Sequence, residues 1–272
     1  MLEEPATLLD FAVRAYPGIL QHDLLRYVIG AGGTFLVVNV LLRRFLAGRQ
    51  IRSERPGGKQ MRWEILASLR TVLIFSLVGF GIALAAQHGL LNVYRDPAAL
   101  GWPYFALNVA LLIVAHDAWF YWTHRLMHRP RLYRWFHRLH HRSNNPTPWT
   151  SYSFDASEAV VNAIYLPIAL MLMPTSVLAA FIFTAHMMLR NAIGHCGYEV
   201  FPARADGRPL FDWLTTVTHH DLHHARAGAN FGLYFTFWDR MMGTEDSDYH
   251  VRFADAVGRR QTGPVAAGIQ EA

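Results

Sequence analysis

The sequence predicts an all-α integral membrane protein, a bundle of about three membrane-spanning helices plus a helical hairpin. Of its 272 residues, 52% are hydrophobic and only 17% are charged, whereas a soluble domain usually carries about 25% charged residues. The apolar residues gather in stretches long enough to cross a bilayer. The segments between these stretches differ sharply in charge. Together these three observations indicate a multi-pass membrane protein.

The apolar stretches set the number of spans. A segment of about 20 apolar residues can cross the hydrocarbon core of a bilayer. Three such stretches contain residues 27–42, 71–86 and 103–122. A fourth, residues 159–189, is apolar throughout but is interrupted by Pro167 and Pro174. Because proline interrupts a helix, Pro174 predicts a helical hairpin that turns within or near the membrane.

The charges of the connecting segments predict an orientation. Residues 43–62 hold seven basic residues and one acidic residue, whereas the N-terminal tail is acidic and residues 87–102 are nearly neutral. Six arginines follow the third stretch, between Arg125 and Arg142. The positive-inside rule therefore places the N-terminus outside, and places residues 43–62 and everything from Arg125 onward in the cytoplasm. Buried core helices of a soluble protein are the alternative, but they would make this alternation a coincidence.

Composition and termini limit other classes of protein. A net charge of +5 and a pI of about 9.5 would suit nucleic-acid binding, but about half of the basic residues lie in two segments that follow apolar stretches. This distribution fits membrane orientation, so we expect no nucleic-acid partner. The single cysteine, Cys196, excludes an internal disulfide framework and a multi-cysteine zinc site. The acidic start of the chain predicts no cleavable signal peptide.

We expect three regions along the chain. Residues 1–102 carry the first membrane spans and the basic loop. Residues 103–258 form the region that holds most of the histidines, with the third span and the hairpin. Residues 259–272 are small and polar, which predicts a disordered tail.

Histidines are the most distinctive feature of the sequence. Twelve of the fifteen lie between His116 and His224. They include three clusters, namely His124 and His128; His137, His140 and His141; and His220, His223 and His224. The first cluster has i, i+4 spacing and the other two repeat i, i+3, i+4, so each cluster shares one helical face. Isolated histidines such as His22, His88 and His250 are more typical of surface or satisfied core positions.

Eight clustered histidines predict two metal ions, because one mononuclear site takes three or four protein ligands. Imidazole suits iron, copper and zinc, and burying so many imidazoles without a metal would leave many hydrogen bonds unmade. Asp117 lies seven residues before His124, on nearly the same face, and we expect it to orient an imidazole, as we do Asp221. His116 is a weaker ligand candidate. Asn230 and Gly232 predict a tight turn that closes the site.

These motifs resemble a known family. HRLMH (124–128), HRLHH (137–141) and HDLHH (220–224) are similar to the histidine signature of the fatty acid hydroxylase/sterol desaturase superfamily, and the flanking HDAWFYWTHR, GHCGYE and NFGLYFTFWDRMMGTE also match it. The resemblance covers roughly residues 110–245. It implies two irons, O2 as co-substrate, and a transmembrane bundle with a cytosolic cap of helices that carries the histidines. The implied ligands are His124, His128, His137, His140, His141, His195, His220, His223 and His224, with His219 as a tenth candidate.

One residue departs from the family pattern. Cys196 follows His195, where the family often has serine, and a thiolate ligand at this position stays open as an alternative.

The resemblance implies hydroxylation of a C–H bond of a membrane lipid, with desaturation or C-4 methyl oxidation of a sterol-like lipid as the close alternative. A zinc-dependent membrane hydrolase is an alternative of another class, but its usual HExxH motif does not occur in the sequence. A metal or haem carrier would need fewer ligands. The sequence also has no haem-binding HPGG motif, no dinucleotide-binding glycine loop and no cysteine set for an iron–sulfur cluster. We therefore expect a separate electron donor: a ferredoxin, a cytochrome or a reductase.

Overall fold

The computed structural model describes residues 7–258, so the predicted tail at 259–272 lies outside the described residues. The described part is mostly helical, as predicted. The long helices are α1 (Leu8–Tyr27), α2 (Gly58–Gln87), α3 (Trp102–Met127), α6 (Ala156–Leu172) and α7 (Val177–Gly194). The short helices are α4 (Pro130–Phe136), α5 (Arg138–His141), α8 (Val217–Arg226), α9 (Phe237–Met241) and α10 (Tyr249–Gly258).

Four helical segments of the described residues are long and apolar enough to cross a membrane. They are Leu8–Leu41, Gly58–Gln87, Trp102–Met127 and Val177–Gly194, and α6 is a shorter apolar helix. The second and third segments contain the predicted spans at 71–86 and 103–122. α6 and α7 are the two arms of the predicted hairpin, and Pro174 lies in the turn between them. The chain is therefore an integral membrane protein.

The first span is longer than the sequence predicts. α1 continues through two π-helical stretches, η1 (Val28–Gly32) and η2 (Phe35–Leu41), which gives 34 residues in one apolar segment. Thr7 caps its start by accepting a hydrogen bond from the backbone N–H of Asp10. The expected start at residue 27 was too late because Asp23 and Arg26 interrupt the apolar pattern. Both side chains are largely buried and form an ion pair of 3.0 Å.

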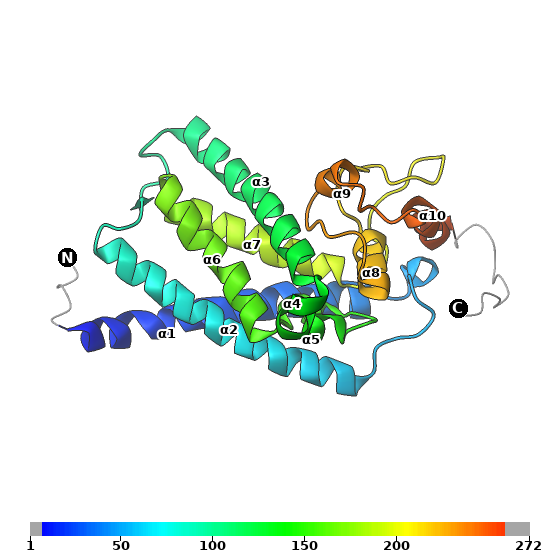
Figure 1. The fold of residues 1–272 in the computed structure, drawn as a ribbon, viewed down its shortest axis with the longest axis horizontal. Coiled ribbons are helices and arrows are strands. Elements are labelled where there is room, and N and C mark those ends of the chain that lie inside the picture. Colours follow the sequence, from blue (N-terminus) through cyan, green and yellow to red (C-terminus); the bar gives the residue numbers. More distant parts are fainter. Residues whose placement is uncertain (1–6, 259–272) are drawn as a thin grey trace.

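The long helices form a ring. Contacts join α1 to α2, α2 to α6, α6 to α3, α3 to α7 and α7 back to α1. At one end of the ring, a short parallel pairing of β1 (Val93–Tyr94) with β2 (Thr175–Ser176) ties the α2–α3 connection to the hairpin turn. The opposite end carries the short helices α4, α5 and α8–α10 as a cap (Figure 1).

The basic segment after the first span lies at the same end as the histidine clusters. The side chain of Arg52 donates to the carboxylate of Asp221 in α8 at 2.8 Å, and Gln50 forms an isolated β-bridge with Tyr198. The two regions therefore share one end of the bundle, as the charge pattern predicts. Which side of the membrane this end faces stays a prediction.

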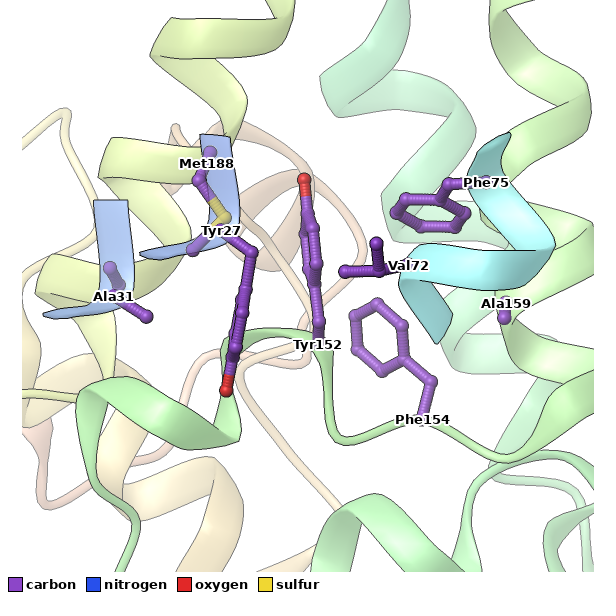
Figure 2. Packing of buried hydrophobic residues seen from close by; sticks show 9 residues of the cluster. Tyr27, Ala31, Val72, Phe75, Tyr152, Phe154, Ala159 and Met188 are labelled. Carbon is purple, nitrogen blue, oxygen red and sulfur yellow. The ribbon is translucent and has the colours of Figure 1, made fainter. Parts of the chain in front are cut away.

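A buried aromatic cluster joins the ring to the cap. The 3₁₀ turn η4 (Pro148–Tyr152) inserts between the long helices, and Figure 2 shows the Tyr152 ring between Tyr27 on one side and Val72 and Phe75 on the other. The Tyr27 and Tyr152 rings stack with centroids 5.7 Å apart. The Tyr27 hydroxyl and the Ser68 hydroxyl both donate to the carbonyl of Trp149. This packing fixes the segment between α5 and α6, and with it the position of the α5 histidines.

Candidate metal centre

Nine histidines from distant parts of the sequence meet at the cap end of the bundle in two neighbouring groups. Within each group, every residue offers one ligand atom within 4.8 Å of the others. The first group is His124, His128, His137, His141 and His223, and the second is His140, His195, His220 and His224. Nine of the ten ligand candidates from the sequence thus come together.

The two clusters with i, i+3, i+4 spacing divide their histidines between the groups in opposite ways. His137 and His141 join the first group, and His140 between them joins the second. In α8, His220 and His224 join the second group while His223 joins the first. Each cluster therefore gives two nitrogens to one group and one to the other, which holds the two groups side by side.

Nitrogen separations in the first group fit a shared metal ion. The Nε2 atoms of His124 and His137 lie 2.9 Å apart, and those of His141 and His223 lie 3.0 Å apart. Two nitrogens bound at about 2.1 Å to one metal, at right angles, lie about 3.0 Å from each other. The observed separations match this value.

The second group has the same dimensions. His195 Nε2 lies 3.0 Å from His220 Nε2 and 3.1 Å from His224 Nε2. The His140 ring centroid lies 4.7 Å from that of His224 and 5.3 Å from that of His195. All four side chains are buried, so the group forms a closed pocket of imidazole nitrogens.

Backbone carbonyls orient several of these rings. The Nδ1 atoms of His124, His195 and His223 lie 2.7–2.9 Å from the carbonyl oxygens of Phe231, Asn191 and Ala229, respectively. Because a carbonyl oxygen only accepts, each Nδ1 carries the proton and each Nε2 presents a lone pair to the group. This is the tautomer that a metal ligand requires.

A buried acidic side chain lies beside a further ring. Glu158 in α6 is fully buried, and its Oε1 lies 2.8 Å from Nδ1 of His137. Nδ1 of His124 donates to the Phe231 carbonyl, so the Nε2 lone pair of His124 faces Nε2 of His137 at 2.9 Å. His124 and His223 both present Nε2 lone pairs to the first group, so the donor set fits a bound metal ion.

Burial keeps these imidazoles neutral. Desolvation and, to a smaller extent, the positive charge that a protonated His223 would carry lower the pKa of His195 to about 4. Desolvation lowers the pKa of His223 to about 4 as well. Desolvation and neighbouring imidazoles also lower the pKa of His140 and of His220 well below the ordinary value. At neutral pH the rings are therefore ready to bind a cation without first losing a proton.

Three predicted site residues have other partners. Asp117 accepts from the backbone N–H groups of Tyr234 and Phe235 at 2.8 and 3.3 Å, so it anchors the chain beside the site. Asp221 forms the ion pair with Arg52. His219 lies outside both groups: its Nε2 is 3.7 Å from Asp239, and its ring packs against Tyr249. On the helical wheel, residue 219 lies about 40° from His223, at the edge of the face that carries the α8 ligand candidates, and its ring packs against Tyr249 instead.

Two further candidates are also placed away from the ligand groups. His116 Nδ1 lies 2.9 Å from the Tyr234 hydroxyl. The His116 ring packs edge-on against the Tyr165 ring. The Cys196 thiol donates to the Tyr198 carbonyl at 3.3 Å, and desolvation raises the pKa of Cys196 to about 12. A buried thiol of this kind stays protonated at neutral pH, which does not favour a thiolate ligand.

Sequence reasoning missed Glu158, although a signal was present. Glu158 is the sole acidic residue of the apolar helix α6, and an ionisable residue in an apolar segment indicates a functional role. The tight turn predicted at Asn230 and Gly232 follows α8, and Ala227 and Asn230 have positive φ there. In that turn Asp239 accepts from the N–H groups of Phe231 and Gly232, which sets the carbonyl that orients His124.

Comparison with known proteins gives a consistent result. The fatty acid hydroxylase family model matches residues 109–244. The chain is 27% identical to the Delta(7)-sterol 5(6)-desaturase erg3C of Aspergillus fumigatus, over 79% of this chain and 72% of that protein. It is 23% identical to methylsterol monooxygenase 1 of Rattus norvegicus, over 88% of this chain and 80% of that protein. It is 32% identical to the very-long-chain aldehyde decarbonylase GL1-1 of Oryza sativa, over 64% of this chain and 29% of that protein.

No solved structure matches the chain. The family match spans half of the chain and includes all nine histidines of the two groups. The match and the relatives agree with the resemblance that the three histidine motifs indicate. The chain therefore belongs to the fatty acid hydroxylase family and is an integral membrane oxidoreductase.

Proposed function

We propose that this protein binds two iron ions and uses O2 to hydroxylate a C–H bond of a membrane lipid. The observation that carries the proposal is the pair of adjacent all-histidine groups, with Nε2 atoms of neighbouring rings about 3 Å apart. One iron would be held by each group. Bound there, two irons would supply the redox chemistry that oxygen insertion into an unactivated C–H bond requires.

The protein's own part is to orient the ligands and exclude water. Backbone carbonyls hold the Nδ1 protons of His124, His195 and His223, so the Nε2 lone pairs of these rings stay directed into the groups. Seven of the nine ligand side chains are buried, and only His128 and His141 are partly exposed. A dry site of this kind limits side reactions of a reactive oxidant.

A lipid substrate is supported by the membrane helices and by the relatives. The relatives' names include a sterol desaturase, a methylsterol monooxygenase and a very-long-chain aldehyde decarbonylase. The apolar helices lead from the bilayer to the histidine groups, since His124 and His195 lie at the cap ends of α3 and α7. A membrane lipid reaches such a site without crossing water.

Desaturation or C-4 methyl oxidation of a sterol-like lipid is the second candidate. It is favoured by the names of the sterol relatives and would use the same histidine groups. A zinc hydrolase needs a glutamate base that faces the metal-bound water. Glu158 instead contacts the outer nitrogen of His137, which gives it an orienting position and disfavours hydrolysis.

We further propose that electrons come from a separate donor and that the cap faces the cytoplasm. The sequence has no motif for haem, flavin or an iron–sulfur cluster. The cap end carries the arginines of residues 43–62 and 125–142, and basic residues favour the cytoplasmic side.

Metal analysis tests the proposal. Protein purified without oxygen should contain two irons per chain and should consume O2 when a lipid extract and a chemical reductant are added. Mass spectrometry of the lipids should show a product heavier by one oxygen atom, or lighter by two hydrogens if desaturation is the reaction. Two tightly held zincs, hydrolysis products and no oxygen uptake would contradict the proposal.

A further inference from the structure

A small cavity lies inside the membrane bundle, apart from the histidine groups. It has a volume of about 90 Å³, is partly open, and is lined by residues of α1, α2, α3, α6 and α7. Apolar side chains such as Phe75, Leu166 and Phe183 line much of it. The polar side chains that line it are Asp23, Arg26, His116, Asn162 and Thr184. Polar groups at this depth in a membrane bundle indicate a binding site or a pathway.

Asn162 is the residue that points to a ligand. Both polar atoms of its carboxamide, Nδ2 and Oδ1, are buried, and neither has a hydrogen-bond partner among the described residues. Burying an amide unpaired is costly, so a partner is expected in the cavity. The carboxamide offers a donor and an acceptor together. A hydroxyl group satisfies both, whereas a carboxylate only accepts and an ammonium only donates.

The charges at the cavity favour a neutral ligand. Arg26 and Asp23 form an ion pair with 3.0 Å between Nη2 and Oδ1, and His22 lies 3.4 Å from the same carboxylate oxygen. The pair neutralises itself, so no net charge is left to bind a charged headgroup in the bilayer interior. Nε of Arg26 is buried without a partner among residues 7–258, which adds a second donor at this side of the cavity.

The cavity is connected to the histidine groups by two helices. On α6, Asn162 lies one turn beyond Glu158, and Glu158 contacts the ligand candidate His137. On α3, His116 at the cavity lies eight residues before His124, which is about 12 Å along the helix axis. A lipid whose polar end occupies the cavity would thus place carbons several bonds from that end near the histidine groups.

We propose that this cavity is a polar subsite that binds a hydroxyl group of the lipid substrate. Asn162 donates to and accepts from that hydroxyl. Thr184, whose own hydroxyl donates to the Phe181 carbonyl at 3.0 Å, offers it a second acceptor. The inference rests on the proposed lipid-oxidising function, because it names the class of lipid that the same site accepts: an alcohol rather than a free fatty acid.

Direct binding of tritiated lipids to the full-length protein in nanodiscs tests the inference. Two pairs of probes differ only in the hydroxyl: cholesterol with 5-cholestene, and 1-octadecanol with octadecane; stearate is the charged comparison. Wild-type protein should bind the alcohol at least 10-fold more tightly than its hydrocarbon in one of the two pairs, because a buried polar site discriminates against a ligand that lacks the hydroxyl. The pair that shows the preference identifies a sterol or an alkyl source.

Two variants locate the preference. Asn162→Leu and Thr184→Val remove polar atoms from the cavity at similar volume, and each should reduce the preference to threefold or less. The matched control is Asn108→Leu, a buried amide on α3 that donates to Thr175 outside the cavity and should keep the wild-type preference. If Asn162→Leu does not fold, as judged by circular dichroism, Thr184→Val decides.

Three results would overturn the inference: equal binding of alcohol and hydrocarbon in both pairs, tighter binding of stearate than of 1-octadecanol, or a preference that survives both cavity variants. Iron content and oxygen uptake are measured on the same samples. If the protein consumes oxygen with lipid but shows no alcohol preference, only the hydroxyl-binding subsite is contradicted. If the protein prefers the alcohol but binds no iron and consumes no oxygen, the proposed oxidative function is contradicted instead.

Discussion

The His137 ring is held on both of its nitrogens. Its Nδ1 contacts Glu158 at 2.8 Å, and its Nε2 faces His124 at 2.9 Å. A carboxylate beside the outer nitrogen of a ligand imidazole makes that imidazole a stronger ligand in many metal sites, and we expect Glu158 to act on His137 in this way. A buried carboxylate in an apolar helix is costly, and its contact with a ligand candidate gives it a reason to be there.

Replacing Glu158 tests this contact. Glu158→Gln keeps the size of the side chain but removes its charge, and we expect iron affinity to fall about 10- to 100-fold. Competition with a calibrated chelator measures the affinity. Glu54→Gln, at an exposed position, is the control and should leave affinity unchanged. Equal affinities of the Glu158 variant and the wild type would contradict the assigned role.

Adjacent histidines in α8 give a second test at this scale. His220 lies 3.0 Å from His195 between their Nε2 atoms, whereas His219 faces Asp239 and Tyr249. His220→Gln should therefore lower the iron content from two to about one per chain, and His219→Gln should leave it at about two. Plasma mass spectrometry of the purified variants measures this. Loss of iron from the His219 variant alone would reverse the assignment.

At the scale of elements, the turn after α8 decides how His124 is oriented. Asn230 has a φ of 58°, and its side chain donates to the His219 carbonyl and accepts from the N–H of Asp246. Asp239 in α9 holds the N–H groups of Phe231 and Gly232. The carbonyl of Phe231 then accepts a hydrogen bond from Nδ1 of His124. The turn thus connects α8, α9 and α3 through the backbone.

Gly232 is the position where this turn tolerates no side chain. A Cβ there would lie 2.6 Å from the Phe235 carbonyl oxygen and 2.8 Å from Asp239 Oδ2. We expect Gly232→Ala to destabilise the protein by roughly 1–3 kcal/mol through overpacking and to lower its iron content. A thermal unfolding curve in detergent measures the stability. The matched control is Gly228→Ala, whose nearest neighbour would be 3.7 Å away; a larger effect there than at Gly232 would refute the argument.

The elements also show how far the sequence alone predicts this fold. Apolar length and Pro174 predicted α2, α3 and the hairpin, because a bilayer fixes the length of an apolar span. Nearly all of α1, which ends at Tyr27, was not predicted. Asp23 and Arg26 make that segment look like a polar tail, and only the tertiary pairing of the two side chains inside the bundle permits their burial.

The candidate metal centre, like the fold, could be predicted only in part from the sequence. Spacing and the family resemblance named the nine histidines that meet, since a helical period fixes which side chains share a face. The division of the histidines between two groups depends on how α3, α5, α7 and α8 converge, which spacing alone does not contain. Glu158 was missed for the same reason, because it reaches His137 only through the packing of α6 against α4.

At the scale of the whole molecule, the bundle has two unlike ends. One end carries the β1–β2 pairing, and the other carries the cap and the basic segment that Arg52 ties to α8. The basic charge at the cap end favours a cytoplasmic position for it. The histidine groups would then face the cytoplasm, where the proposed electron donor would reach them.

Cysteine labelling tests this orientation. The native Cys196 is buried, so it should give little background. Ala98→Cys lies in the exposed α2–α3 connection and Arg44→Cys in the exposed basic segment. A membrane-impermeant maleimide should label the first variant in intact cells, and the second only after permeabilisation. The opposite pattern would place the cap outside.

The central claim is that two metal ions lie side by side among nine histidines, and anomalous diffraction from crystals of the iron-loaded protein tests it most directly. Data collected on both sides of the iron absorption edge should give two peaks per chain, one within each histidine group. A single peak, or two peaks outside these groups, would contradict the claim.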